Sequence, residues 1–179
     1  LHDALPISAD AKGLLKAAIR SDNPVVFLEN EILYGHSFEE IGNDNDVAEI
    51  GKAVIKRAGT DVTLTAFSLQ VKFALEAAEI LAQENINVEV IDLRSLRPLD
   101  TDTIITSVRK TNRLVVVEEA WPLGSIATEV AFKVQKEAFD YLDAPVTRIT
   151  SADVPLPYAP TLIEAALPNV SRVVKAVKE

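Results

Sequence analysis

Short apolar runs alternate with longer stretches in which apolar residues recur every three or four positions through most of this chain. The first pattern is typical of buried β-strands, and the second is typical of amphipathic helices packed on a sheet. Predicted strands lie at residues 25–28, 53–56, 62–67, 88–93, 114–117 and 146–149. Predicted helices lie at residues 9–20, 69–84, 101–110, 125–139 and 161–178. This alternation predicts an α/β fold with a mostly parallel sheet and helices on both of its faces.

Local signals predict where several helices begin and end. Asp100 or Thr101 is expected to cap the third helix, because a side-chain oxygen there can accept a hydrogen bond from a free amide of the first turn. Pro24 follows the first helix, and proline disfavours helical backbone in the residue before it. Pro168 is expected to break the last helix for the same reason.

An acidic stretch with Asn43-Asp44-Asn45-Asp46 and two glycines separates two structural units and is typical of a linker. The run at residues 25–28 is continuously apolar, which predicts a strand buried on both faces. The chain thus divides into an unmatched segment, a first unit, a linker and a second unit, at residues 1–8, 9–35, 36–52 and 53–179.

The composition excludes several classes of site and partner. The chain contains no cysteine, so disulfides, thiolate nucleophiles and cysteine-ligated metals are excluded. His2 and His36 are its only histidines, which argues against a multi-histidine metal site. A formal net charge of -9 repels a phosphate backbone and favours basic partners, so nucleic-acid binding is not expected. No apolar run approaches the roughly 20 residues of a membrane span, and we expect a soluble intracellular protein.

The chain contains no complete catalytic motif. It has neither a Gly-rich phosphate loop nor a Walker-type lysine, and Ser68 lacks the flanking glycines of a nucleophile elbow. Glu118-Glu119 lies at the carboxyl end of a predicted strand, where open parallel sheets commonly bind ligands. Adjacent residues on a strand point to opposite faces, however, which favours a strand end turning into a loop over a functional pair.

Three loop features have both a functional and a structural interpretation. His36 has the chemistry of a general base, but a single loop histidine is usually solvated. Trp121 is expected to pack a loop rather than stack on a cofactor. Two prolines in residues 153–158 favour an extended backbone shaped for a surface contact, with a purely structural loop as the alternative.

Several strings of the sequence resemble, in order, one family. They lie at residues 13–20, 23–31, 33–35, 91–100, 110–122, 139–145 and 152–159. Together they are similar to the C-terminal part of the beta subunits of the thiamine diphosphate-dependent, decarboxylating component of pyruvate dehydrogenase. The resemblance extends from about Ala9 to the end of the chain.

This resemblance implies a transketolase C-terminal-type domain at residues 53–179, preceded by the tail of a thiamine pyrimidine-binding domain at residues 9–35. The family's cofactor-activating glutamate matches no position here, so no catalytic or cofactor-binding residue is assigned and the chain alone is expected to be inactive. The intact enzyme would use thiamine diphosphate and magnesium to decarboxylate pyruvate and transfer acetyl to lipoyl groups. It would assemble as alpha2beta2, from alpha subunits and two beta subunits, in the bacterial cytoplasm or, in a eukaryote, the mitochondrial matrix.

Two further sites of the family map onto this chain. A potassium site matches Ala18, Ile19, Ser21 and Asn23, where the last carbonyls of a helix lack intrahelical partners. The family often has aspartate in place of Ser21. The contact with the basic peripheral subunit-binding domain of the dihydrolipoyl acyltransferase matches Asp143. The alternatives are a water-capped helix end and an ordinary turn aspartate.

Other functions remain compatible with the sequence. Branched-chain 2-oxo acid and acetoin dehydrogenases share this beta-subunit architecture, although residues 28–31 and 153–159 resemble the pyruvate type more. A stand-alone, non-catalytic binding module is a second alternative. Transketolase and deoxyxylulose phosphate synthase are more distant alternatives; they fuse all their domains in one chain, so the length of the gene would separate them. The sequence that precedes Ala9 in the native gene would discriminate among these functions.

Overall fold

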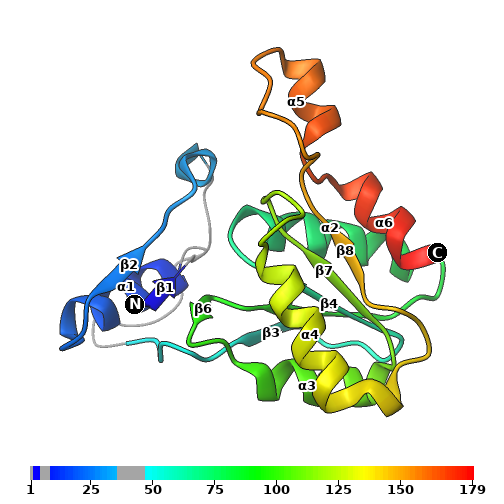
Figure 1. The fold of residues 1–179 in the computed structure, drawn as a ribbon, viewed down its shortest axis with the longest axis horizontal. Coiled ribbons are helices and arrows are strands. Elements are labelled where there is room, and N and C mark those ends of the chain that lie inside the picture. Colours follow the sequence, from blue (N-terminus) through cyan, green and yellow to red (C-terminus); the bar gives the residue numbers. More distant parts are fainter. Residues whose placement is uncertain (1, 5–8, 36–46) are drawn as a thin grey trace.

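The computed structural model of the chain describes residues 2–4, 9–35 and 47–179, so most of the predicted linker, and His36, lie outside the described residues. Its main body is a five-stranded sheet with the order β3-β5-β4-β7-β8 (Figure 1). The strands are β3 (Val54–Arg57), β4 (Val62–Ala66), β5 (Val88–Asp92), β7 (Leu114–Val117) and β8 (Thr147–Ile149). Every neighbouring pair except β3–β5 is parallel, which confirms the predicted mostly parallel sheet.

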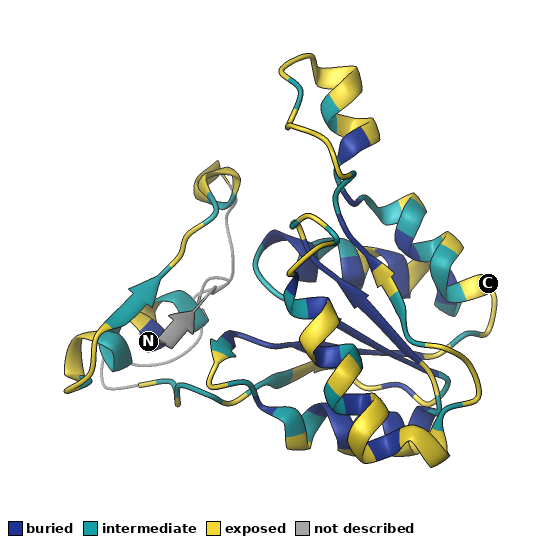
Figure 2. Cartoon of the chain, in the orientation of Figure 1, coloured by how far each residue is buried: buried dark blue, intermediate teal, exposed yellow. Residues whose placement is uncertain are grey.

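Helices cover both faces of this sheet, as the alternating pattern predicts (Figures 1 and 2). They are α2 (Leu69–Ala82), α3 (Thr101–Thr111), α4 (Ile126–Ala138) and α6 (Val170–Lys178). On one face, Leu64 belongs to a buried cluster with Leu81 of α2 and Val173 of α6. On the other face, Val116 belongs to a second cluster with residues of α3 and Val130 of α4. Burial from both sides explains why a continuous apolar run encodes β7, and why Thr63 and Thr65 of β4 are buried along with their apolar neighbours.

Two predicted helix boundaries are confirmed. Oδ1 of Asp100 accepts a hydrogen bond from the Thr103 amide at 3.2 Å and caps α3. The last helical region is divided near Pro168 into α5 (Pro160–Ala166) and α6. Asn169 caps α6, because its Oδ1 accepts a hydrogen bond from the Arg172 amide at 3.0 Å.

The edge strand β3 does not form a hairpin with β4, although only a short turn joins them. It runs antiparallel to β5, which lies between β3 and β4. The chain crosses the start of β5 at this turn, where Nη1 of Arg57 donates to the Val88 carbonyl at 2.6 Å. A Cβ on Gly59 would lie 2.2 Å from the Glu89 nitrogen, so the crossing requires glycine.

A smaller sheet, with the order β2-β1-β6, lies beside the main body (Figure 1). The elements of this region are β1 (His2–Ala4), α1 (Ala9–Arg20), β2 (Val25–Phe27), the 3₁₀ helix η1 (Glu31–Gly35) and β6 (Ser95–Arg97). Neither β1 nor β6 was predicted from the sequence, since strands of three residues are too short to show a period. The prediction that β2 is buried on both faces is wrong: β2 is an edge strand and only half-buried.

The segment from residue 153 through α5 projects from the main body as an arm (Figure 1). Most of its surface is exposed (Figure 2), including Leu156, Tyr158 and Leu162. Nothing in the described part of the chain forms a helix long and apolar enough to cross a membrane.

Candidate functional site

A cleft of about 360 Å³ opens at the carboxyl ends of β4 and β7. The order of strands reverses between these two, because the chain passes from β4 to β5 on one side and then to β7 on the other. Open α/β sheets bind ligands at this position. One wall follows β4, a second follows β7 and includes Glu118 and Glu119, and residues 28–30 from the N-terminal unit form a third.

Glu118 fixes helix α4 to the end of β7. Its side chain is buried, its Oε2 accepts from the Ile126 amide at 3.2 Å, and its Oε1 accepts from the Ala127 amide at 3.0 Å. A carboxylate in this position satisfies free amides and faces the positive end of the helix dipole. Glu118 therefore positions α4, which agrees with the structural interpretation of the Glu118-Glu119 pair.

Glu119 points the other way, as expected for adjacent residues near a strand end, and is exposed at the cleft. Nε2 of Gln70 donates to its Oε2 at 3.4 Å. Gln70 is only 2% exposed, and its Oε1 has no hydrogen-bond partner in the described structure. Gln70 was not predicted as a site residue; its one signal in the sequence is a polar residue between the apolar Leu69 and Val71 at the start of α2.

The cleft is acidic and does not fit a diphosphate group. Its lining includes the carboxylates of Glu29, Glu118 and Glu119, and no lysine or arginine is among the described residues that line it. Phosphate groups need positive charge or a run of free amides, and three carboxylates repel them. Across the residues that the structure describes, no group of three or more histidine, aspartate or glutamate side chains could hold a metal ion.

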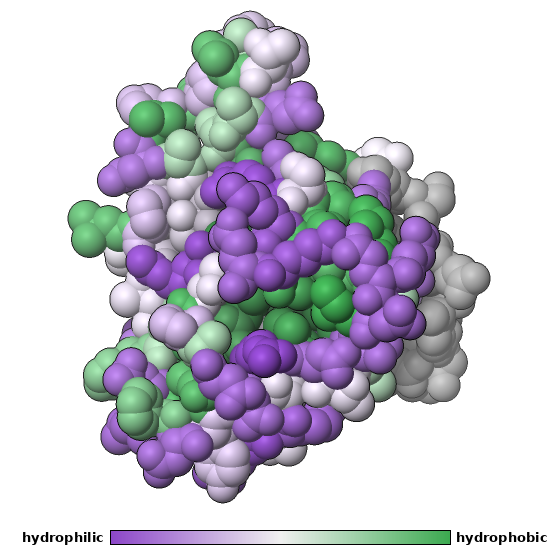
Figure 3. Space-filling view, turned by 90° about the vertical axis from the view of Figure 1, so that its right-hand side faces the viewer, coloured by the Kyte–Doolittle hydropathy of each residue, from purple (hydrophilic) through white to green (hydrophobic). Residues whose placement is uncertain are grey.

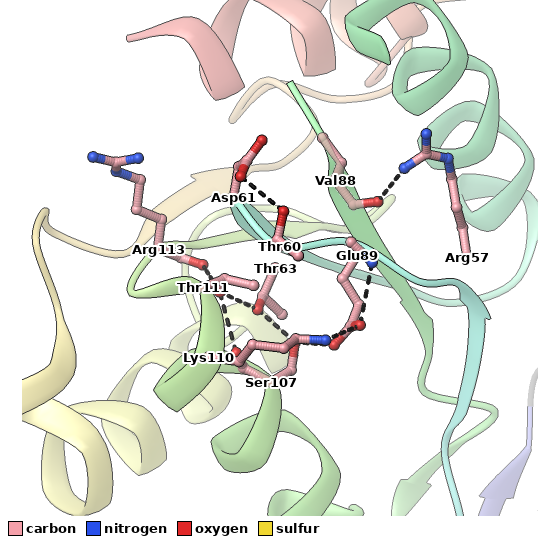
Figure 4. A network of polar contacts seen from close by, with 11 residues as sticks. Arg57, Thr60, Asp61, Thr63, Val88, Glu89, Ser107, Lys110, Thr111 and Arg113 are labelled. Carbon is pink, nitrogen blue, oxygen red and sulfur yellow. Dashed lines mark hydrogen bonds and ion pairs between the residues drawn. The ribbon is translucent and has the colours of Figure 1, made fainter. Parts of the chain in front are cut away.

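A second polar cluster is buried between the sheet and α3 (Figure 4). Glu89 is 1% exposed and accepts hydrogen bonds from the Ser107 hydroxyl at 2.6 Å and the Gly59 amide at 3.3 Å, and it pairs with Lys110. Burial acts to raise the pKa of Glu89, but these donors outweigh it and lower the pKa below its ordinary value. Ser107 also contacts the Thr63 hydroxyl at 2.6 Å, so the network ties α3 to β4 and β5.

A third cluster joins the N-terminal unit to the main domain. Asp10 of α1 pairs with Lys56 at 2.6 Å and with Arg94 at 3.1 Å. The adjacent Asp92 is fully buried, and its Oδ1 accepts from the Arg94 amide at 3.0 Å while its Oδ2 has no partner among the described residues. Burial raises the pKa of Asp92 to about 7, although Lys56 and Arg94 act to lower it.

The residues predicted for a potassium site lie at the end of α1 and in the turn that follows it: Ala18 and Ile19 are in the last turn of the helix, and Ser21 and Asn23 come after it. The Ser21 amide donates to the Ala18 carbonyl at 3.3 Å, and the Asn23 amide donates to the Ser21 hydroxyl at 3.2 Å. Ile19 is exposed on the last turn of the helix. The turn thus brings backbone and hydroxyl oxygens close to one another at the negative end of a helix.

Asp143 lies on a different surface, in the loop that leads to β8. Its side chain is 61% exposed and its carboxylate lies 3.9 Å from Nη2 of Arg113. Its amide donates to the Asn112 carbonyl at 2.9 Å, which fixes the loop to the end of α3. An open groove of about 760 Å³ beside it is lined by apolar side chains that include Phe132 and Phe139.

Trp121 packs against the proline-containing loop, as the sequence analysis predicts. Its Nε1 donates to the Val154 carbonyl at 3.1 Å, although its ring remains largely exposed. A pocket beside it is lined by Val154 and Leu156, and the space-filling view shows hydrophobic residues on the surface of the arm (Figure 3).

Comparison with protein families finds the transketolase C-terminal domain at residues 51–173. Relatives of similar sequence are named pyruvate dehydrogenase E1 component subunit beta. The protein of Rhizobium meliloti is 57% identical over 96% of this chain and 37% of its own length. That of Rickettsia felis is 56% identical over 97% of this chain and 53% of its own length. The mitochondrial subunit of Caenorhabditis elegans is 56% identical, over 97% of this chain and 51% of its own.

The chain therefore spans about half, or less, of the length of these curated relatives. Among solved structures, a split-gene transketolase described as an inactive beta4 tetramer aligns with a TM-score of 0.83. That alignment is 28% identical in sequence and covers 99% of this chain and 56% of the other. The predicted transketolase C-terminal-type fold is thus confirmed.

Proposed function

Because this chain belongs to the family of the transketolase C-terminal domain, we propose that it is the C-terminal part of the beta subunit of a pyruvate dehydrogenase. The observation that carries this proposal is the identity of 56–57%, over almost the whole chain, with E1 beta subunits of bacteria, rice and Caenorhabditis elegans. In this proposal residues 9–35 are the tail of a pyrimidine-binding domain and residues 36–52 are a linker. Its setting is the bacterial cytoplasm or the mitochondrial matrix.

The proposed contribution of this chain is assembly rather than chemistry. In the intact enzyme, thiamine diphosphate bound with magnesium would supply decarboxylation of pyruvate and acetyl transfer to lipoyl groups. The acidic cleft at β4 and β7 is unsuited to the diphosphate. We therefore assign no catalytic or cofactor-binding residue to the described part of the chain, and we expect the chain alone to be inactive.

The proposed partners are an alpha subunit and a second beta subunit, in an alpha2beta2 assembly. The apolar groove that contains Phe132 and Phe139 supports a role in association, since contiguous apolar patches mark interaction surfaces. Tyr158 of the arm is 98% exposed, and Leu123 in the loop between β7 and α4 is 89% exposed. The related split-gene transketolase chain is described as forming a tetramer.

We also propose that Asp143 binds the basic peripheral domain of the dihydrolipoyl acyltransferase. The carboxylate is exposed, and its ion pair with Arg113 is long, at 3.9 Å, and therefore weak. A cationic residue of the partner can thus replace Arg113 as the counter-ion of Asp143. The neighbouring groove, with Phe132 and Phe139, offers apolar contact area beside the charge.

A potassium ion at Ala18, Ile19, Ser21 and Asn23 is the last part of the proposal. Oxygens of Ala18 and Ser21 each accept one hydrogen bond in this turn and keep a further lone pair. The family's frequent aspartate is absent, so the site relies on neutral oxygens. A weakly held monovalent cation suits such a ligand set better than a divalent ion does.

The test is reconstitution of the complete native beta subunit with its alpha subunit, thiamine diphosphate and magnesium. We expect turnover of pyruvate in preference to a branched-chain 2-oxo acid or acetoin. Preference for either competitor would assign the chain to the related dehydrogenases instead. Absence of turnover with all three substrates would favour a non-catalytic module. The aligned split-gene transketolase tetramer, described as inactive, is an example of such a chain without activity.

A further inference from the structure

The cleft between β4 and β7 contains a buried acceptor without a donor. Gln70 is 2% exposed, and its amide nitrogen is directed to Glu119 at 3.4 Å. Its carbonyl oxygen, Oε1, accepts no hydrogen bond from the described residues. Because buried acceptors are normally satisfied, this oxygen points to a donor that a ligand would bring.

Two carboxylates stand at the mouth of the same cleft. Glu119 is exposed beside Gln70, and Glu29 reaches the cleft from the N-terminal unit. The Tyr34 hydroxyl donates to Glu29 at 2.9 Å and holds its carboxylate in place. Glu118 lies beneath them and adds negative charge, although the amides of α4 occupy both of its oxygens.

These three charges have no cationic partner among the described residues. The ion pairs of the described chain involve other carboxylates, and no lysine or arginine lines the cleft. Apolar side chains of Leu28 and Leu96 complete the lining. Carboxylates beside an unpaired amide oxygen and apolar walls form a site for a cation that carries both N–H donors and a hydrocarbon portion.

We infer that this cleft binds an organic cation of the guanidinium or ammonium class. Its N–H groups donate to Oε1 of Gln70 and to Glu119, and its charge faces Glu29. A guanidinium fits best, because its planar fork supplies several donors at once. The cation is either a free small molecule or a basic side chain of another protein chain. The inference does not depend on the activity proposed above.

The experiment titrates the 179-residue chain with methylguanidinium at constant ionic strength, by calorimetry and by fluorescence of Trp121, which is the single tryptophan and lies two residues beyond Glu119. We expect saturable binding, and no saturable binding of tetramethylammonium, which has the charge but no N–H donor. Glu119→Gln should weaken binding about tenfold, the effect of one lost charge-assisted hydrogen bond. Gln70→Leu should weaken it as well.

Glu137→Gln is the matched control, since Glu137 is exposed on α4 and does not line the cleft. If Gln70→Leu does not fold, the exposed Glu119→Gln variant decides the question alone. N-acetyl-arginine amide distinguishes the two sources of the cation. Tighter binding of this compound than of methylguanidinium identifies a protein side chain as the source, and weaker binding identifies a free small cation. Equal affinity of Glu119→Gln and the parent chain for methylguanidinium overturns the inference. So does the absence of saturable binding of both methylguanidinium and N-acetyl-arginine amide to the parent chain.

Discussion

The hydroxyl of Ser107 donates to Oε1 of Glu89 at 2.6 Å and joins helix α3 to strand β5 through a buried contact (Figure 4). The same hydroxyl lies 2.6 Å from that of Thr63 on β4, which in turn lies 2.6 Å from that of Thr111. A buried carboxylate is tolerated here because hydroxyl, amide and ammonium donors surround it. The network therefore fixes the register of α3 on two strands at once.

Ser107→Ala is expected to destabilise the fold by about 1 to 3 kcal/mol, because it leaves buried oxygens of Glu89 and Thr63 short of a partner. Urea unfolding followed by circular dichroism measures the change. Thr106→Ala is the matched control, since its side chain is exposed on the same helix. Equal unfolding free energies for the two variants would contradict the structural role of the network.

Asp92→Asn should make stability less dependent on pH. Burial raises the pKa of Asp92 from 3.8 to about 7, so between these values the folded state holds a proton that the unfolded state has lost. Stability therefore falls as pH rises through this window, by up to about 1.4 kcal/mol per pH unit, and levels off above it. The variant should be more stable than the parent at pH 8 and equal to it near pH 4.

Thermal unfolding at a series of pH values between 4 and 8 measures this difference, with the exposed Asp153→Asn as the control. A gap between Asp92→Asn and the parent that stays constant with pH would show that Asp92 is ionised throughout. The amide keeps the acceptor for the Arg94 backbone, so loss of that hydrogen bond does not confuse the result.

Gly59→Ala is expected to destabilise the fold by about 3 kcal/mol, since the new Cβ would lie 2.2 Å from backbone atoms of Val88 and Glu89. Backbone cannot move aside as a flexible side chain can. Gly35→Ala is the control, because a Cβ there meets nothing within 4 Å. Chemical denaturation should separate the two, and similar midpoints would mean that the β3–β4 crossing can relax.

The elements that the sequence predicted well are those with local causes. Asp100 caps α3 through an amide three residues away, and Pro168 interrupts the last helix by its own geometry. Strand β7 could be predicted because burial on both faces leaves a continuous apolar run, and β4 because its residues are apolar or β-branched. None of these signals depends on residues distant in sequence.

What the sequence did not predict depends on distant partners. The antiparallel pairing of β3 with β5 is decided by the crossing at Gly59, and β6 exists because a strand of the N-terminal region pairs with it. The role of Glu118 depends on where α4 begins in space, and the contact of the buried Gln70 amide with Glu119 depends on the end of another strand. The type of a residue alone does not predict these contacts between residues that are distant in sequence.

The proposed potassium site predicts a salt-specific effect on stability. Potassium chloride should raise the melting temperature more than equal sodium or lithium chloride, because the oxygens of the turn after α1 would prefer the larger ion. Binding stabilises by mass action, about 2.7 kcal/mol at a hundredfold excess over the dissociation constant. Calorimetric scans at constant ionic strength measure the effect, and identical curves in the three salts would remove the site.

Asp143 makes the most direct prediction about a partner. Charge favours the contact, since the chain has a formal charge of -9 and the proposed peripheral domain is basic. Removing the carboxylate also releases Arg113, now 3.9 Å away, which would then repel a basic partner. Both effects are electrostatic and act at an exposed position, so both should be screened by salt.

The measurement is a titration of assembled alpha2beta2 enzyme, carrying Asp143→Asn, with the isolated peripheral domain at low and at high salt. We expect binding to weaken by about 1 to 3 kcal/mol at low salt, and by less at high salt. Asp140→Asn is the control, because Asp140 is an exposed acid three residues earlier in the same segment. A loss that is equal in both variants would reflect overall charge rather than a contact. Unchanged affinity of Asp143→Asn at both salt concentrations would make Asp143 an ordinary turn residue, held by the hydrogen bond from its backbone amide to the Asn112 carbonyl.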